Sequence, residues 1–242
     1  VTFTASPDAQ PGVRDFKIFT HRGVSTVGQI VITRDPVVRD DVKTDTMEGA
    51  KEFQVPATLT GVFEKNEDLD YFKFSGEAGQ RLVIHCRCMR LQDRIHDLQT
   101  HADPIITVKN HLGSTIAASD NYFAADPYLV VEIQQSGEYY LEVRDVRYKS
   151  NAYWNYAIEV IDRPFPTNAF PLAIAADQPA TFELIGESLA PGTMASFDAF
   201  PIKLQQGRQW LSLPAPDGHH QAQHRRHPPY PLLCRRCAPK RL

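Results

Sequence analysis

Short runs of β-favouring residues recur between turn residues along the stretch 57–160, and this pattern is the strongest constraint on the fold. Val, Ile, Phe, Tyr and Thr dominate the runs, whereas Gly, Pro, Asp and Asn separate them. The runs are ATLTGVF at 57–63, YFKFSG at 71–76, RLVIHCRCM at 81–89, IITVKN at 105–110, LVVEIQ at 129–134, EYYLEVRD at 138–145 and NYAIEV at 155–160. About seven strands spaced in this way are typical of a β-sandwich or jelly roll of roughly 100 residues. The sequence therefore predicts an all-β chain built on a jelly-roll-like β-sandwich.

Alternation within two of these runs indicates which side chains enter the core. Successive side chains of a strand point to opposite faces of the sheet, so one face is expected to be buried and the other wet. The expected inward residues are Leu82, Ile84, Cys86, Cys88, Tyr139, Leu141 and Val143, and the expected outward residues are Tyr140, Glu142 and Arg144. Because Cys86 and Cys88 lie two apart on one strand, they are predicted to be small apolar fillers rather than a disulfide.

Composition and charge exclude two classes of partner. The chain has 242 residues with 42% hydrophobic content, which is enough to bury a core, and a formal net charge of -3. Binding to nucleic acid requires a clustered positive surface, so nucleic acid is not expected as a general partner. The sequence has no apolar run long enough to cross a bilayer, so no membrane span is expected.

A series of short motifs between 40 and 161 resembles the bacterial pre-peptidase C-terminal domain. The motif residues are Asp68, Asp70 and Tyr71; Gly79 and Gln80; Asp103 and Pro104; Gly113; Asp120 and Asn121; and Gly137–Tyr140. They follow the family's order at the expected spacing. The resemblance implies a secreted β-sandwich of the kind that is appended to proteases and surface proteins, and it places the sandwich at 57–161.

The flanking segments continue the predicted β organisation. Residues 1–36 contain a hairpin, with FKIFT and TVGQIVIT on either side of HRG, and they resemble the end of a truncated Ig-like domain. Residues 37–56 are charged and poor in aromatic residues, as in an acidic linker. Residues 162–205 resemble the start of a further Ig-like β domain, an arrangement similar to large surface proteins of planctomycete-type bacteria. Residues 206–242 are rich in Pro, His and Arg and are predicted to be disordered.

The resemblance implies a non-catalytic role outside the cell or at its surface, as a spacer, an adhesion module or a substrate-targeting module. The expected partners are polysaccharide or protein at the cell surface. The alternative is that the chain is part of a secreted peptidase or hydrolase whose catalytic domain lies outside these residues. Tyr148, Tyr153 and Trp154, in the loop YKSNAYWNY, are the candidate binding surface, because flat rings stack on ligands at low entropic cost.

Acidic residues in the linker and ahead of the second strand form a candidate calcium site. Members of the family from collagenases bind calcium at these two places, which implies a site formed by Asp40, Asp41, Asp45, Asp68 and Asp70. Calcium takes about six to eight oxygen ligands, and acidic loops of extracellular modules supply them. The sequence departs from the family's Glu-x-Glu-Pro-Asn-Asp run, because Asp-Asp-Val-Lys-Thr-Asp stands in its place. Turn capping is the alternative role for these side chains.

Three other sets of polar residues have the composition of a metal site, and each has a structural alternative. The alternatives are turn caps for the first set, a polar loop for the second and a disordered tail for the third. The sets are Asp120, Asn121 and Asp126; His96, Asp97, His101 and Asp103, where Asp103 is expected to cap a turn; and His220, His224, His227, Cys234 and Cys237.

The run GESLA at 186–190 is close to the Gly-x-Ser-x-Gly elbow of serine hydrolases. In that elbow the serine must lie between a buried strand and a helix. Ser188 is instead followed by Leu-Ala-Pro-Gly, which does not favour a helix. The sequence therefore predicts a β-turn at Ser188 and no catalytic residue.

Overall fold

The computed structural model describes residues 2–40, 44–92, 100–173, 180–197, 209–213 and 230–234, and these form nineteen strands and one short helix. The all-β prediction is confirmed. The chain divides into two compact units, Val13–Arg163 on the one hand and Val1–Gly12 with Pro164–Leu242 on the other.

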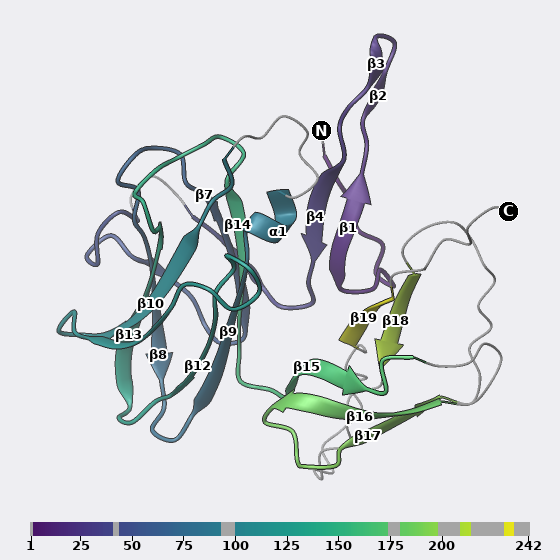
Figure 1. The fold of residues 1–242 in the computed structure, drawn as a ribbon. Helices are drawn as coiled ribbons and strands as arrows, with labels where there is room; N and C mark the ends of the chain where they lie inside the picture. The colour runs from purple at the N-terminus through teal and green to yellow at the C-terminus, as the bar shows by residue number, and fades with distance from the viewer. Residues whose placement is uncertain are drawn as a thin grey trace, which may run out of the picture. The chain divides into compact units, whose positions relative to one another are not determined.

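The larger unit contains a β-sandwich of two five-stranded sheets, which we name sheet A and sheet B (Figure 1). Sheet A has the order β11-β10-β13-β8-β6, with β11 (Thr115–Ser119), β10 (Pro104–Asn110), β13 (Gly137–Asp145), β8 (Asp70–Gly76) and β6 (Lys51–Glu52). Sheet B has the order β12-β9-β14-β7-β5, with β12 (Tyr128–Glu132), β9 (Arg81–Arg87), β14 (Asn155–Ile161), β7 (Ala57–Val62) and β5 (Val37–Arg39). The seven predicted strands are all present, and β11 is an addition to them.

The segment 37–56, predicted to be a linker, contributes a strand to each sheet. At its start β5 pairs in parallel with β7 of sheet B, and at its end β6 pairs in parallel with β8 of sheet A. The chain between them therefore leads from one sheet to the other, and we name its described residues, 40 and 44–50, the crossing segment. The sequence did not reveal these two strands because each is only two or three residues long. Such short strands are stabilised by hydrogen bonds to a longer neighbouring strand, not by an apolar pattern of their own.

The core lies between the inner faces of the two sheets. All seven side chains expected to point inward are buried, including the free cysteines Cys86 and Cys88. The largest fully buried side chains are Trp154, Tyr156, Phe63, Phe72, Phe74, Leu59, Leu82, Ile84, Ile106, Ile133, Leu141 and Ile158. Each large apolar side chain of this kind contributes about 1.5–3 kcal/mol when it leaves water, so the interleaved faces are the main source of the sandwich's stability.

Glu142, one of the three side chains predicted to point outward, departs from the expected alternation, as do Val83 and His85 on strand β9, which are 1% and 4% exposed. Glu142 was predicted to be wet, but it is only 6% exposed. The Tyr71 hydroxyl donates to its Oε2 at 2.5 Å, and the Lys109 ammonium approaches the same oxygen at 2.6 Å. These cross-strand neighbours cover the carboxylate, so this position of the strand is polar but not exposed to solvent.

The acidic loop between β11 and β12 is held by a buried carboxylate. Asp126 has no exposed surface and accepts hydrogen bonds from the backbone N–H groups of Cys88, Met89 and Arg90 at 3.0, 2.6 and 3.2 Å. These groups begin the short helix α1 (Met89–Gln92), and the Arg90 side chain donates from Nε at 2.6 Å. Asp126 is therefore a cap, as its structural alternative predicted, whereas Asp120 of the same loop is exposed.

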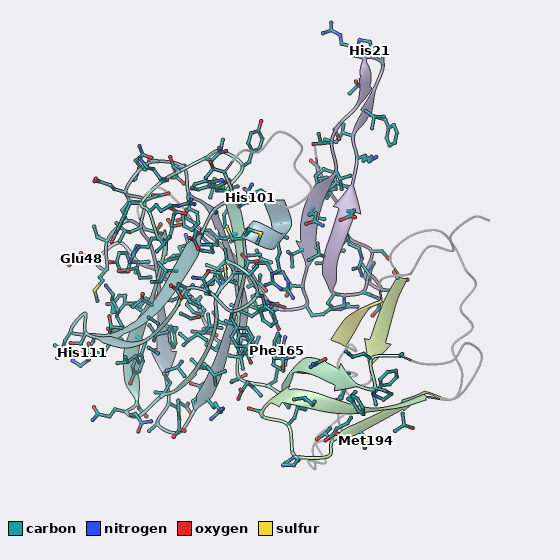
Figure 2. All side chains as sticks on the ribbon, viewed as in Figure 1. His21, Glu48, His101, His111, Phe165 and Met194 are labelled. Atoms are coloured by element: carbon teal, nitrogen blue, oxygen red, sulfur yellow. The ribbon has the colours of Figure 1, made fainter. Side chains whose placement is uncertain are left out.

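The larger unit begins with a hairpin. Strand β1 (Gly12–Phe16) pairs with β4 (Gly28–Ile32), and β2 (Phe19–Thr20) pairs with β3 (Gly23–Val24) nearer the tip, where His21 lies (Figure 2). Asp35 follows the hairpin and accepts two hydrogen bonds from the Arg163 guanidinium, at 3.0 and 2.6 Å. A bidentate pair of this kind ties the start of the sandwich to its end.

The other unit contains a three-stranded sheet and a separate strand pair. The sheet has the order β15-β16-β17, with β15 (Phe165–Phe170), β16 (Ala180–Glu187) and β17 (Met194–Phe197). In the segment predicted to be disordered, β18 (Gln209–Leu213) pairs with β19 (Tyr230–Cys234), so these ten residues are extended and paired. The remainder of 206–242, apart from these strands, lies outside the described residues. The Ig-like character of 1–36 and 162–205 stays a prediction.

Replacement of Asp126 by Ala is expected to lower the free energy of unfolding by about 3–5 kcal/mol, because it leaves Arg90 and the first N–H groups of α1 without their buried acceptor. Urea denaturation measures the change. Asp120→Ala, in the same loop but exposed, is the matched control and is expected to stay within about 0.5 kcal/mol of the wild type. Equal losses in both variants would contradict the assignment of Asp126 as the cap.

Candidate metal site

Three carboxylates gather where the crossing segment meets the start of strand β8. Asp45 lies in the crossing segment, as does Glu48, which is labelled in Figure 2. Asp68 precedes β8, and Asp70 is its first residue. One oxygen from each of the three carboxylates lies within 4.8 Å of the other two. This spacing suits oxygen ligands that share one cation.

Asp68 contributes the most unusual oxygen of the group. The residue is only 2% exposed, and its Oδ2 accepts a hydrogen bond from the backbone N–H of Glu64 at 2.9 Å. Its Oδ1 is buried without a hydrogen-bond donor, and the nearest cationic group in an ion pair with it is the Lys65 ammonium at 3.9 Å. A buried carboxylate oxygen without a donor is costly, so this atom is the one that a bound cation would satisfy.

Asp70 is 1% exposed and lies between two neutral hydroxyl groups. The Tyr156 hydroxyl, which comes from strand β14 of the opposite sheet, donates to Oδ2 at 2.7 Å. The Thr44 hydroxyl lies 3.5 Å from Oδ1 and also donates to Asp40 Oδ1. Asp70 is thus enclosed between the core and the crossing segment.

Asp45 forms the open side of the group. Its side chain is 37% exposed and forms an ion pair with the Lys65 ammonium, whose own side chain is 49% exposed. An exposed pair of this kind is weak, and a lysine on a flexible stem can leave it at small cost. Asp45 therefore offers a route by which an ion from solvent reaches the two buried carboxylates.

The ionisation of these acids reflects a concentration of negative charge in a buried place. Burial raises the pKa of Asp70 to about 8, and the Tyr156 hydrogen bond opposes this shift, while Asp40, Asp68 and Glu64 add to it. Burial is also the main cause of the raised pKa of Asp68 and of Glu64. The chain alone thus favours a proton on Asp70 at neutral pH, and a cation would supply the missing positive charge.

The structure brings together three of the five residues predicted to form the calcium site. Asp45, Asp68 and Asp70 form the group, and Asp40 borders it through the Thr44 hydroxyl. Asp41 lies outside the described residues, as does Lys43 of the atypical Asp-Asp-Val-Lys-Thr-Asp run.

Sequence reasoning missed Thr44 and Tyr156 as parts of the site. Thr44 carries no charge, so only its place beside Asp45 could have drawn attention to it. Tyr156 carried a signal in its inward position on NYAIEV, since a buried tyrosine needs a partner for its hydroxyl. The partner itself could not be named, because it comes from residue 70 on the other sheet.

Other predicted metal ligands do not gather in the part of the chain that the structure describes, where Asp45, Asp68 and Asp70 are the one group with ligand spacing. Asp103 was expected to cap a turn, but its backbone N–H donates instead to Asp145 Oδ2 at 2.9 Å, so the cap is Asp145. His96, Asp97, His220, His224, His227 and Cys237 lie outside the described residues, and Cys234 is described only as the end of β19.

Ser188 lies in a turn after strand β16, with a φ of 55°. Among the described residues that follow, 189–197 contain a second turn and then strand β17. The predicted turn is confirmed, and the helix that a nucleophile elbow requires does not follow it in this range.

Two of the three aromatic residues predicted to bind a ligand are accessible. Tyr148 is 43% exposed, with the Arg144 guanidinium 4.5 Å from its ring centre, and Tyr153 is 59% exposed. Trp154 was wrongly placed on this surface, because it is only 2% exposed and its indole N–H donates to the Thr100 carbonyl at 3.0 Å. It packs in the core because burial of its large apolar ring lowers the free energy of the fold more than exposure to water would.

No helix among the described residues is long and apolar enough to span a membrane.

Comparisons with known proteins give a family match and likenesses to 14 solved chains, two of which are described here. The family described as "Bacterial pre-peptidase C-terminal domain" matches residues 68–145. The pre-peptidase C-terminal domain of a collagenase from Bacillus anthracis aligns at 13% identity with a TM-score of 0.36, over 46% of this chain and 93% of that one. PliG from Aeromonas hydrophila, a periplasmic inhibitor of g-type lysozyme, aligns at 16% identity with a TM-score of 0.30, over 52% and 96%.

A comparison with curated protein sequences gives no match. The family match spans β8 to β13 of the sandwich, and it starts at Asp68 and so includes two of the three gathered carboxylates. The resemblance read from the sequence motifs is confirmed for this part of the chain. Residues 68–145 therefore match the family of bacterial pre-peptidase C-terminal domains.

Proposed function

We propose that the chain is a non-catalytic module of a secreted or cell-surface protein, and that calcium bound at Asp45, Asp68 and Asp70 stabilises its sandwich. The main observation in favour of a calcium site is the buried Oδ1 of Asp68. This oxygen belongs to one of the three gathered carboxylates and has no hydrogen-bond donor. The family match at 68–145 supports the module and its place outside the cell.

Calcium suits this site better than a transition metal does. The three gathered ligands are all carboxylates, and hard oxygen ligands favour calcium or magnesium over zinc or copper. Calcium accepts irregular arrangements of oxygens and waters, whereas magnesium demands near-octahedral geometry and keeps its water. Asp45 is partly exposed, so water can complete the coordination on that side.

Calcium bound here would link two parts of the sandwich, the crossing segment and the start of β8. Asp45 belongs to the crossing segment, and Asp68 and Asp70 belong to the start of β8. The backbone already joins them through the N–H of Tyr71, which donates to the Thr44 carbonyl at 2.8 Å. The ion would add positive charge between the segments and so remove the repulsion among their carboxylates.

A role as a spacer, an adhesion module or a substrate-targeting module accords with this picture. Tyr148 and Tyr153 are the exposed rings that we propose contact polysaccharide or protein at the cell surface. A secreted peptidase or hydrolase with its catalytic domain elsewhere is the second candidate, because the family is named for its place beside peptidases. In either case this chain supplies binding and stability, not the reaction.

Calcium is expected to raise the melting temperature of the protein. At about 10 mM calcium, a site with a dissociation constant of about 0.1 mM adds about 2.7 kcal/mol to the free energy of unfolding. This corresponds to roughly 5–10 °C for a chain of this size. The protein is first treated with a chelator. Differential scanning fluorimetry then measures the melting temperature, and isothermal titration calorimetry measures the dissociation constant for calcium.

Asp68→Asn is the informative variant, because the amide keeps the shape of the side chain and removes its charge. It is expected to abolish the calcium-dependent rise in melting temperature. Asp120→Asn, at an exposed carboxylate outside the group, is expected to keep it. A wild-type protein whose melting temperature does not respond to millimolar calcium would refute the site.

Without metal, stability is expected to fall as the pH rises from about 5 to 8 through the contribution of Asp70. The pKa of Asp70 is near 3.8 in the unfolded chain and about 8 in the folded one, so only the unfolded carboxyl is ionised between these values. The contribution to stability is complete below the unfolded pKa and is lost through the folded pKa, at up to about 1.4 kcal/mol per pH unit.

Urea denaturation of the wild type and of Asp70→Asn, both in chelator, isolates this contribution. The difference between their free energies of unfolding is expected to change steadily between pH 5 and 8, because the amide does not titrate. The comparison also cancels the effect of His85, whose pKa is lowered to about 4 by burial. A difference that is independent of pH would show that Asp70 is ionised in the metal-free fold.

The non-catalytic proposal predicts that the purified chain does not turn over generic peptide or ester substrates. Ser188 offers the sharpest test, since it is the residue that a serine hydrolase would require here. Substrate cleavage by the wild type that disappears in Ser188→Ala would overturn the proposal, whereas the background rate is expected to be identical in the two proteins.

A further inference from the structure

We infer that Tyr156 is a positioning residue for the cation site, because its hydroxyl fixes the orientation of the Asp70 carboxylate from the opposite sheet. The inference rests on the proposed calcium site and adds to it a residue of the core that does not itself touch the ion. Its evidence is a hydrogen bond, a glycine that makes room for that bond, and the way in which the other carboxylates are held.

Tyr156 reaches the site through the interior of the sandwich. It lies on β14 of sheet B, is 1% exposed, and packs its ring against Phe63 with 5.3 Å between ring centres. Its hydroxyl donates to Oδ2 of Asp70, on sheet A, at 2.7 Å. A ring packed in the core has few alternative rotamers, so the position of the hydroxyl is fixed by the core itself.

Gly61 gives the phenol its space. It is paired with Tyr156 across the β7–β14 ladder, and a Cβ at this position would lie 2.3 Å from the Tyr156 hydroxyl oxygen and 2.8 Å from Asp40 Cβ. Any side chain at residue 61 would therefore displace either the hydroxyl or the start of the crossing segment. A single residue without a side chain thus accommodates both the tyrosine and the acidic segment.

The hydrogen bond decides which way Asp70 faces. With Oδ2 held by Tyr156, the other oxygen, Oδ1, lies 3.5 Å from the hydroxyl of Thr44, the neighbour of Asp45 in the crossing segment. Asp68 is held in a similar manner, since its Oδ2 accepts from the Glu64 backbone and its Oδ1 has no donor. Each buried carboxylate thus has one oxygen anchored to the protein and a second one directed elsewhere.

Anchoring of this kind is how proteins fix ligand geometry before a metal arrives. Partners that orient metal-binding side chains change metal affinity by about 10- to 100-fold when they are removed. Without the phenol, Asp70 would lose a buried donor and could rotate its carboxylate plane. The orientation needed for the ion would then have to be selected upon binding, which weakens affinity.

Tyr156→Phe is the direct test, with Tyr139→Phe as its matched control. Tyr139 is also a core tyrosine, 7% exposed, and its hydroxyl donates to the Gln135 carbonyl at 2.6 Å, a bond that involves none of the gathered carboxylates. Each variant removes one hydroxyl and one hydrogen bond. Tyr156→Phe is expected to bind calcium about 10- to 100-fold more weakly by calorimetry, and Tyr139→Phe is expected to bind like the wild type.

A spectroscopic signal separates positioning from general loss of stability. Calcium binding places a divalent charge beside the carboxylate that Tyr156 contacts, so the wild type is expected to show a tyrosine difference spectrum in the near ultraviolet. The signal is expected to persist in Tyr139→Phe and to vanish in Tyr156→Phe. If Tyr156→Phe does not fold by circular dichroism, Gly61→Ala, which displaces the hydroxyl but keeps the phenol, is expected to weaken binding in the same way.

The outcomes distinguish this inference from the proposal on which it rests. A wild type that binds no calcium removes the site altogether. A wild type that binds calcium, together with a folded Tyr156→Phe of equal affinity, overturns the positioning role and leaves the site intact. Equal weakening in Tyr156→Phe and Tyr139→Phe also overturns it, because the effect would then follow from stability alone.

Discussion

The burial of alternate side chains between sheets A and B is the constraint on which the rest of the sandwich depends. Inward residues such as Phe72, Leu141 and Ile158 have no exposed surface, and they fix the register of every strand that carries them. Once the register is fixed, a polar group that points inward has to find its partner across the core. The bond from Tyr156 to Asp70 is one such case, and it joins the two sheets at the buried end of the three gathered carboxylates.

The period-two pattern was sufficient to predict the sandwich, because seven strands carry their own apolar face. It was insufficient for β5 and β6, which exist only as parallel additions to longer strands, and for Trp154, which follows a turn and has no alternation to place it. The acidic site was predicted in part, since charge is visible in sequence and the family resemblance named the places. Its neutral members, Thr44 and Tyr156, depend on contacts between residues far apart in the chain, which no local pattern records.

The partners of the buried acids show how the cluster of Asp45, Asp68 and Asp70 differs from an ordinary buried ion pair. Asp126 is joined to Arg90 at 2.6 Å, Glu142 to Lys109 at 2.6 Å and Asp145 to Arg147 at 3.3 Å. In these pairs the chain itself supplies the positive charge, and removal of the basic partner leaves a carboxylate charge in a poorly solvated place. Such pairs are complete, so they have no use for an ion from solvent.

Asp68 and Asp70 follow another arrangement, in which the chain supplies orientation but little charge. Asp70 accepts from the neutral hydroxyl of Tyr156, and Asp68 accepts from a neutral backbone N–H, with the Lys65 ammonium no closer than 3.9 Å. Neutral donors hold a carboxyl group in place without supplying positive charge, so that charge is left for a bound cation to provide. A closer arginine would stabilise the fold as Arg90 does, but it would also occupy the position of an ion. The contrast between Arg90 beside Asp126 and Tyr156 beside Asp70 is therefore the physical difference between a structural ion pair and the cation site that we propose.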